Sequence, residues 1–205
     1  MKLYFVRHGE SEANVLQVYS NNSHLHPLTE KGRGQAHALA ESLQGLPLSK
    51  IYYSPVLRAT QTAAILASEL QLPSEMADAL REYDVGVLEG QTYEIGEPIY
   101  REVAEAWIRG EWERRIEGGE SFLDIQRRFV PFLESLIGQY SSTIDGIVLV
   151  GHGGTYMGML PLILSNIDIQ FALQHGIPYT EKIVAEPREG KLFCLAWGET
   201  VFANE

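Results

Sequence analysis

The chain has 205 residues, of which 45% are hydrophobic, and its formal net charge at pH 7 is −11. This length and apolar content suit one compact domain, and the acidic balance argues against binding to nucleic acids or to anionic membranes, because both need clustered Lys and Arg. The chain has a single cysteine, Cys194, so we expect no internal disulfide. We see no amino-terminal signal pattern and no apolar run of membrane-spanning length, and we therefore expect a cytoplasmic protein.

Strand-like apolar runs alternate with helical patterns along the chain. In chain order we predict a strand at 3–6, a helix from Thr29 to Gly45, a strand at 51–53, a helix after Ser54-Pro55, a helix from Phe122 to Gly138, a strand at 147–150, and further strands at 183–186 and 192–197. The alternation predicts an α/β fold, a three-layer sandwich with a mostly parallel central sheet. We interpret residues 1–205 as one domain, with a small helical cap inserted at about 90–119, where the chain is polar, aromatic and punctuated by glycines.

Polar residues follow several of these strands. His8 comes directly after the first strand, Arg58 after the strand at 51–53, Glu82 after a short run near 76–80, and His152 after the strand at 147–150. In a parallel sheet the loops and helix starts beyond the carboxyl ends of the strands form the usual ligand site. The topology therefore predicts that these four residues meet at one edge of the sheet.

The pair Arg7-His8 suits a phosphoryl group. A guanidinium binds an anion with two parallel hydrogen bonds, and a neutral imidazole is a nucleophile near physiological pH. Gly9 allows a close turn after the strand, and adjacent arginines favour the neutral form of His8 by lowering its pKa. Arg58 in the first turn of a helix opposes the helix dipole, so an anionic partner is expected there.

Five sets of residues, in order, resemble the successive motifs of the histidine phosphatase superfamily, the phosphoglycerate mutase-like proteins. They are residues 7–14 (RHGESEAN), 27–36, 54–63, 80–90 with 119–121, and 150–154 (VGHGG). The resemblance implies that His8 carries the phosphoryl group and that Glu82 gives and takes protons. It further implies that Arg7, Arg58 and His152 stabilise the charge on the phosphoryl oxygens. Asn14 and Gly153 complete the implied substrate-binding set, without a cofactor or a metal.

The family contains both phosphatases and mutases, and the departures from the mutase pattern favour a phosphatase. Where glycolytic mutases have a tyrosine three residues and a lysine eleven residues after the glutamate, this chain has Val85 and Tyr93. Their Ser-Gly pair is replaced by Asn21-Asn22, and Arg114-Arg115 resembles their paired arginines in different surroundings. We therefore predict a phosphomonoester hydrolase acting on small phosphorylated metabolites, with mutase-type phosphoryl transfer as the alternative.

Two interpretations of other classes stay open. His24 and His26 have a spacing that could place them with His8 or His152 around zinc in a metal-dependent hydrolase. The chain could also be a catalytically silent phosphate-binding module. The expected partner is a small phosphate ester, with no nucleic acid and no membrane. The sequence leaves the oligomeric state open, a homodimer included.

Overall fold

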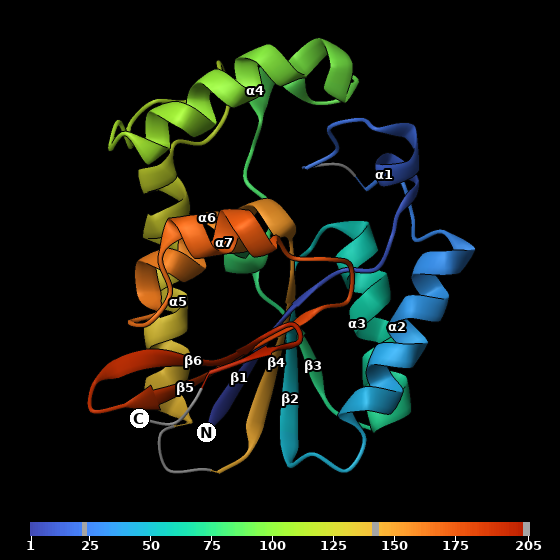
Figure 1. Cartoon of the computed structure of the whole chain (residues 1–205). Helices are drawn as coiled ribbons and strands as arrows, with labels where there is room; N and C mark the ends of the chain where they lie inside the picture. Colours follow the sequence, from blue (N-terminus) through green and yellow to red (C-terminus); the bar gives the residue numbers. More distant parts are fainter. Residues whose placement is uncertain (22–23, 141–143, 203–205) are drawn as a thin grey trace.

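A seven-stranded mixed sheet forms the centre of the protein in the computed structural model, which describes residues 1–21, 24–140 and 144–202 (Figure 1). Asn22, half of the Asn21-Asn22 pair, lies outside the described residues. The strands are β1 (Lys2–Arg7), β2 (Leu48–Tyr53), β3 (Ser74–Met76), β4 (Gly146–Gly151), β5 (Lys182–Arg188), β6 (Lys191–Trp197) and β7 (Thr200–Val201). Their order is β3-β2-β4-β1-β5-β6-β7. The first four strands are mutually parallel, whereas β5, β6 and β7 pair antiparallel on the far side of β1.

Helices cover both faces of the sheet. They are α1 (Glu12–Leu16), α2 (Glu30–Leu43), α3 (Leu57–Leu70), α4 (Tyr93–Ile108), α5 (Phe122–Gln139), α6 (Gly153–Ile163) and α7 (Ile169–His175), with short 3-10 turns η1 (Asp78–Leu80) and η2 (Gly86–Leu88). Helices α2 and α3 lie on one face of the sheet, and α5, α6 and α7 on the other (Figure 1). This is the three-layer α/β fold that the sequence predicts.

The alternation of side chains along the strands produces two cores. Leu3 and Phe5 of β1 pack in the cluster on the side of α5 and α6, whereas Tyr4 and Val6 pack in the cluster with α2 and α3. Strand β4 divides in the same way, and all six of its residues are buried. Successive side chains of a strand point to opposite faces, so a strand covered on both sides is apolar throughout.

The predicted helix starts agree with the structure. The Thr29 hydroxyl caps α2 by accepting the Gly32 N–H, and Ser121 caps α5 together with Asp124. Such caps satisfy amide groups that have no partner within the helix. The antiparallel strands β5 and β6 are also at their predicted positions, although the sequence did not indicate their direction.

Helix α4 stands apart from the three layers, above the end of the sheet where β1 and β4 finish (Figure 1). It belongs to the segment predicted to form a cap, while the division of residues 1–205 into one domain with an inserted cap stays a prediction. Within the described residues, no helix is long and apolar enough to cross a membrane.

Candidate active site

Two histidines lie side by side because their strands are neighbours. Strands β1 and β4 pair in parallel with Arg7 opposite Gly151, so the next residues, His8 and His152, emerge together at the carboxyl edge. The centres of the two rings are 5.1 Å apart. Both side chains are buried, with exposed fractions of 3% and 0%. The predicted meeting of the two histidines is therefore present.

The hydrogen bonds of His8 define its tautomer. Its Nδ1 lies 2.7 Å from the Gly9 carbonyl oxygen, which can only accept, so Nδ1 carries the proton. Its Nε2 accepts a 2.9 Å hydrogen bond from Nε of Arg58. Burial, followed by the charges of Arg58 and Arg7, lowers the pKa of His8 well below its usual range. The sequence indicated only the effect of the arginines, but burial is the larger cause of the lowered pKa. His8 is thus neutral, with its lone pair on Nε2, where it accepts from Arg58.

Arg58 joins the two histidines. It lies in the first turn of α3 and is 4% exposed. Besides its bond to His8, its guanidinium donates to the Ser20 carbonyl at 2.5 Å and to Nδ1 of His152 at 3.2 Å. Because Arg58 can only donate, Nε2 of His152 carries the proton and donates to the Ser54 hydroxyl at 2.7 Å. Burial, again with Arg58 second, lowers the pKa of His152 well below its usual range. Both ring nitrogens of His152 are therefore engaged with protein groups, and its role as a donor to phosphoryl oxygens stays a prediction.

Arg7 is held by a loop after α7. Its guanidinium donates to the Ile177 carbonyl at 2.8 Å and lies 4.1 Å from the centre of the Tyr179 ring. Its Nε is buried and has no hydrogen-bond partner among the residues that the structure describes. A buried donor without an acceptor is costly, and an anion bound beside it would remove that cost. The next residue of the loop, Thr180, has a φ of 58°. A β-branched residue in this left-handed region is strained, so the loop maintains its position over Arg7 at an energetic cost.

Glu82 is oriented by the start of α6. One oxygen accepts the N–H of Gly154 at 2.9 Å, and the other accepts the N–H groups of Thr155 at 2.7 Å and of Tyr83 at 3.1 Å. The carboxylate is 8% exposed. Residue 154 must be a glycine here, because a Cβ atom at that position would lie within about 3.0 Å of the Glu82 oxygens and closer to the Tyr83 ring.

A half-buried ion-pair network fixes the segment that carries Glu82. The Glu120 carboxylate pairs with Arg81 and Arg128 and accepts the N–H of Asp84, while Arg128 also donates to the Arg81 carbonyl. Burial raises the pKa of Glu120, but the hydrogen bond and charge of Arg128 outweigh it, so the net shift is downward. Residues 81 to 84 are therefore anchored to the start of α5.

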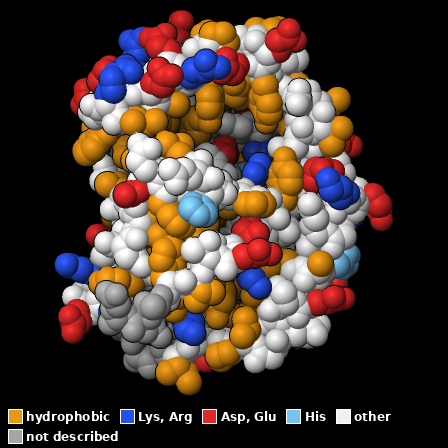
Figure 2. Space-filling model, viewed as in Figure 1, with side chains coloured by type: hydrophobic (Ala, Val, Ile, Leu, Met, Phe, Trp, Pro, Cys, Tyr) orange, Lys and Arg blue, Asp and Glu red, His pale blue; other side chains and the backbone are white. Residues whose placement is uncertain are grey.

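These groups surround a cavity of about 510 Å³. Figure 2 shows it as a hollow between the upper part of the molecule and the body, with basic side chains inside. The residues that line it are Arg7, His8, Asn14, Tyr19, Asn21, Arg58, Glu82, Tyr93, Glu97, Tyr100, Arg101, Ala104, Gly153 and Gly154. The structure thus brings six of the seven predicted site residues to one cavity, and the seventh, His152, lies directly behind Arg58.

The two weaker members of the predicted set have clear local roles. Asn14 turns its oxygen toward Ser11, accepting from the backbone N–H at 3.0 Å and the hydroxyl at 2.8 Å, so its amino group is the part available as a donor. Gly153 begins α6, and a Cβ atom there would lie 3.2 Å from Nε of Arg7. A side chain at position 153 would therefore crowd Nε of Arg7.

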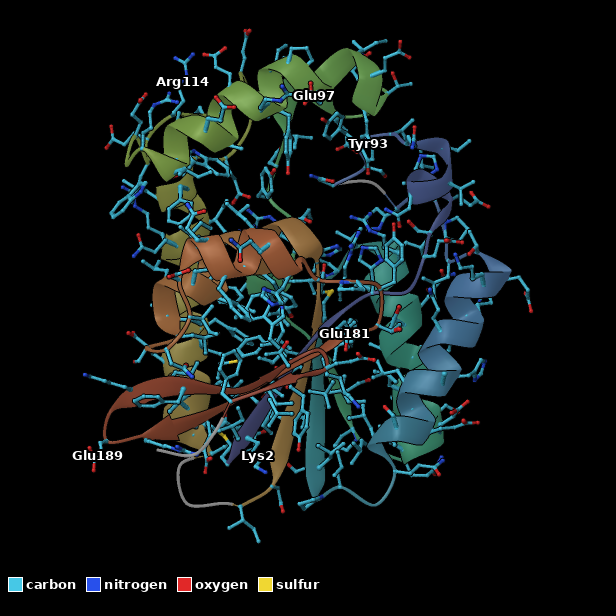
Figure 3. The ribbon with its side chains drawn as sticks, viewed as in Figure 1. Lys2, Tyr93, Glu97, Arg114, Glu181 and Glu189 are labelled. Carbon is cyan, nitrogen blue, oxygen red and sulfur yellow. The ribbon has the colours of Figure 1, made fainter. Side chains whose placement is uncertain are left out.

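Other residues that the sequence singled out lie elsewhere. His24 and His26 do not line the cavity, and across residues 1–21, 24–140 and 144–202 no group of three or more His, Cys, Asp or Glu side chains is placed to hold a metal ion. Arg114 and Arg115 pair with Glu102 and Asp124. In Figure 3 Arg114 lies at the opposite end of the cap from Tyr93.

Several residues that contribute to the site were not predicted from the sequence. Tyr179 and Ile177 belong to an irregular loop with no motif, and no pattern indicates that it returns to β1. Tyr19 and Tyr100 also line the cavity, but a single tyrosine in a sequence is equally compatible with a place in the core. Thr155 had a usable signal, since it directly follows the predicted glycine pair at a helix start.

The chain is similar to several known proteins. Residues 3–200 match the family model for the histidine phosphatase superfamily, branch 1. The chain is 31% identical over 168 residues to the adenosylcobalamin/alpha-ribazole phosphatase of Salmonella typhimurium, covering 82% of this chain and 79% of that protein. It is also 31% identical over 153 residues to a probable phosphoglycerate mutase GpmB of Yersinia pestis, covering 75% and 70%.

Solved structures share the fold. The alpha-ribazole phosphatase of Shigella flexneri superimposes with a TM-score of 0.80 at 24% identity over the whole of both chains. A mycobacterial glucosyl-3-phosphoglycerate phosphatase gives a TM-score of 0.81 at 24% identity, covering 97% of this chain and 99% of that one.

Proposed function

The chain belongs to branch 1 of the histidine phosphatase superfamily, and we propose that it is a metal-independent phosphomonoester hydrolase that forms a phosphohistidine on His8. One observation carries the proposal. The Nε2 lone pair of a buried, neutral His8 lies at the cavity wall, beside the guanidinium groups of two arginines. Nucleophile and anion-binding groups are therefore adjacent.

In the first step the phosphoryl oxygens take over the hydrogen bonds of the arginines. The unpaired Nε of Arg7 gains an acceptor, and Arg58 exchanges its bond to His8 for one to the substrate, which frees the lone pair of Nε2. Nε2 then attacks phosphorus, the ester P–O bond breaks, and Glu82 in its protonated form gives its proton to the departing alkoxide oxygen.

In the second step the same carboxylate works in reverse. Glu82, now ionised, removes a proton from a water molecule, whose oxygen attacks phosphorus while the P–N bond to His8 breaks. Inorganic phosphate leaves, and Glu82 is again protonated. Because Glu82 both donates and accepts a proton, its carboxyl group must stay in one position through both steps. The backbone N–H groups of Tyr83, Gly154 and Thr155 hold it there.

The charges around the cavity favour hydrolysis over phosphoglycerate mutation. A mutase must hold a substrate that carries a carboxylate besides its phosphate, which requires a further cation. The cation of α4 that lines the cavity, Arg101, is bound to Glu97. Arg114 and Arg115 are paired with other carboxylates. The presence of a probable mutase among the relatives keeps phosphoryl transfer as the second candidate.

A substrate panel tests the proposal. Purified protein is expected to release inorganic phosphate from simple phosphomonoesters, with the same rate after dialysis against EDTA, and to interconvert no phosphoglycerates when bisphosphoglycerate is supplied. Acid quenching during turnover is expected to trap an acid-labile phosphoryl group that His8→Ala lacks. Mutase activity without hydrolysis, loss of activity with the chelator, or no trapped group would each overturn the corresponding part.

A further inference from the structure

The underside of α4 forms the part of the cavity farthest from the sheet. Its lining residues, Tyr93, Glu97, Tyr100, Arg101 and Ala104, recur at intervals of three and four, so they share one face of the helix. Figure 3 shows Tyr93 and Glu97 on α4, above the space that separates this helix from the body. A group attached to a phosphate at Arg7 and Arg58 that extends across the cavity therefore meets this face.

Three tyrosines dominate this region. The Tyr19 ring lies 4.8 Å from the Tyr93 ring and 5.5 Å from the Tyr100 ring, centre to centre. Tyr19 comes so close to α4 that a Cβ atom at Gly96 would lie 2.5 Å from its ring. The glycine thus permits an aromatic cluster that joins the cap to the segment after α1. We call Tyr19, Tyr93 and Tyr100 the tyrosine wall.

Tyr93 connects this wall with the phosphate end of the site. Burial raises the pKa of its hydroxyl, and a hydrogen bond from Asn14 and the charges of Arg58 and Arg7 act in the opposite direction. Tyr93 lines the same cavity as Arg7, Asn14 and Arg58, so its side chain and the groups proposed to bind phosphate face one space.

The charges on this face cancel. Glu97 accepts from Nε of Arg101 at 2.6 Å, and both side chains line the cavity. Among the described residues, the remaining cations that line it are Arg7 and Arg58, which belong to the phosphate end. A second anionic group on the substrate would meet Glu97 and no unpaired cation. A cationic group would meet Arg101, which is equally compensated.

We infer that the tyrosine wall is a leaving-group subsite for an uncharged alcohol that carries a planar ring. The rings supply apolar contact area and aromatic stacking, and the paired Glu97 and Arg101 provide no net charge for a charged ring substituent. Tyr93 is the specificity-determining residue, because it is the most exposed of the three tyrosines that line the cavity. This inference rests on the proposed function, since it needs a phosphate ester bound at His8.

A matched series of esters tests the subsite. Benzyl phosphate, ethyl phosphate, 4-carboxybenzyl phosphate and 4-(trimethylammoniomethyl)benzyl phosphate are all esters of primary alcohols and differ in ring and charge. The kcat/KM for benzyl phosphate is expected to exceed that for ethyl phosphate and for both charged esters by about tenfold. Tyr93→Leu is expected to remove the preference for benzyl over ethyl phosphate, and Tyr93→Phe, which keeps the ring, to retain it.

The control is Ile95→Ala, a change on the same helix at a side chain that is 64% exposed and does not line the cavity. It is expected to behave like the unchanged protein with all four esters. Equal kcat/KM values for the four esters, a preference for either charged ester, or a preference that survives Tyr93→Leu would overturn the subsite while leaving the proposed function intact. No phosphate release from any of the four would instead remove the proposed function.

Discussion

Replacing Glu82 by Gln removes one of the two carboxylate oxygens that accept hydrogen bonds from three backbone N–H groups. Oε2 accepts the Gly154 N–H, and Oε1 accepts the N–H groups of Thr155 and Tyr83. A glutamine side chain has one oxygen, so its amino group must face at least one of these N–H donors. The arrangement that costs least gives up only the Gly154 bond. Leaving one buried donor unsatisfied costs about 1–3 kcal/mol of stability, which urea denaturation can measure.

The effect on catalysis is expected to be larger and to depend on the leaving group. Loss of a general acid slows a reaction by about 10²–10⁴-fold when the departing alkoxide needs the proton. The 4-nitrophenolate ion departs without that help. Because kcat/KM reports the steps up to the first irreversible one, we expect Glu82→Gln to lower kcat/KM far more for benzyl phosphate than for 4-nitrophenyl phosphate.

The two esters also provide the refutation. If Glu82→Gln lowers kcat/KM by the same factor for both, Glu82 does not protonate the leaving oxygen and the loss comes from disturbed geometry. Glu94→Gln, a change on the exposed side of the cap start, serves as the matched control and is expected to alter neither value.

Three further predictions test other parts of the site. Arg58→Ala and Arg58→Lys are both expected to lower kcat by about 10²–10³-fold, since lysine keeps the charge but lacks the planar guanidinium that reaches His8, Ser20 and His152 together. In Arg58→Ala the acidic limb of the pH–rate profile is expected to move to higher pH, because Arg58 lowers the pKa of His8. An acidic limb that does not move would contradict this effect of Arg58. Tyr179→Leu is expected to raise KM several-fold and to weaken inhibition by inorganic phosphate, because it removes a cation–π contact with Arg7 worth about 0.5–2 kcal/mol. Tyr179→Phe keeps the ring and is expected to change both values little. Equal effects of the two substitutions would count against this role of Tyr179. Glu120→Gln is expected to cost about 1–3 kcal/mol of stability at neutral pH. Because folding lowers the pKa of Glu120, its contribution is complete above the unfolded value near 4.5 and disappears as the pH falls through the lower folded value, so a stability gap that stays constant in acid would argue against the ion pairs.

Strands β1, β2, β4, β5 and β6, helices α2, α3 and α5, and the edge where the site forms could be predicted from periodicity and chain order, whereas β3, β7, α6 and α7 were not predicted. Residues 3–6 and 147–150 are apolar throughout because both faces of their strands are covered, and His8 and His152 follow at the same edge. The role of Arg58 was predictable in kind, since a cation in a first helical turn needs an acceptor. The identity of its acceptors, which include both histidines, could not be predicted, because the sequence carries no information on side-chain direction.

The parts that escaped prediction depend on contacts between segments far apart in the chain. Tyr179 reaches Arg7 only because β5 returns antiparallel beside β1, and no local pattern gives a strand its direction. The close approach of Tyr19 to Gly96 likewise depends on the placement of α4 over the end of α1. A single glycine in a helix can be present for many reasons. The reason at Gly96, the space that the Tyr19 ring occupies, is known only once the position of Tyr19 is known.

The pairing of Arg7 with Gly151 also links activity to the correct alignment of strands β1 and β4, so activity can be used to measure correct folding. A one-residue slip of β1 against β4 would turn Leu3 and Phe5 toward the wrong helices, and it would move His8 away from Arg58 in the same motion. A chain with misaligned strands therefore cannot retain partial activity through a nearly correct site. After refolding from denaturant, titrating His8, the proposed nucleophile, with a phosphoryl donor is expected to count the molecules with native strand alignment, independently of how compact the other molecules are.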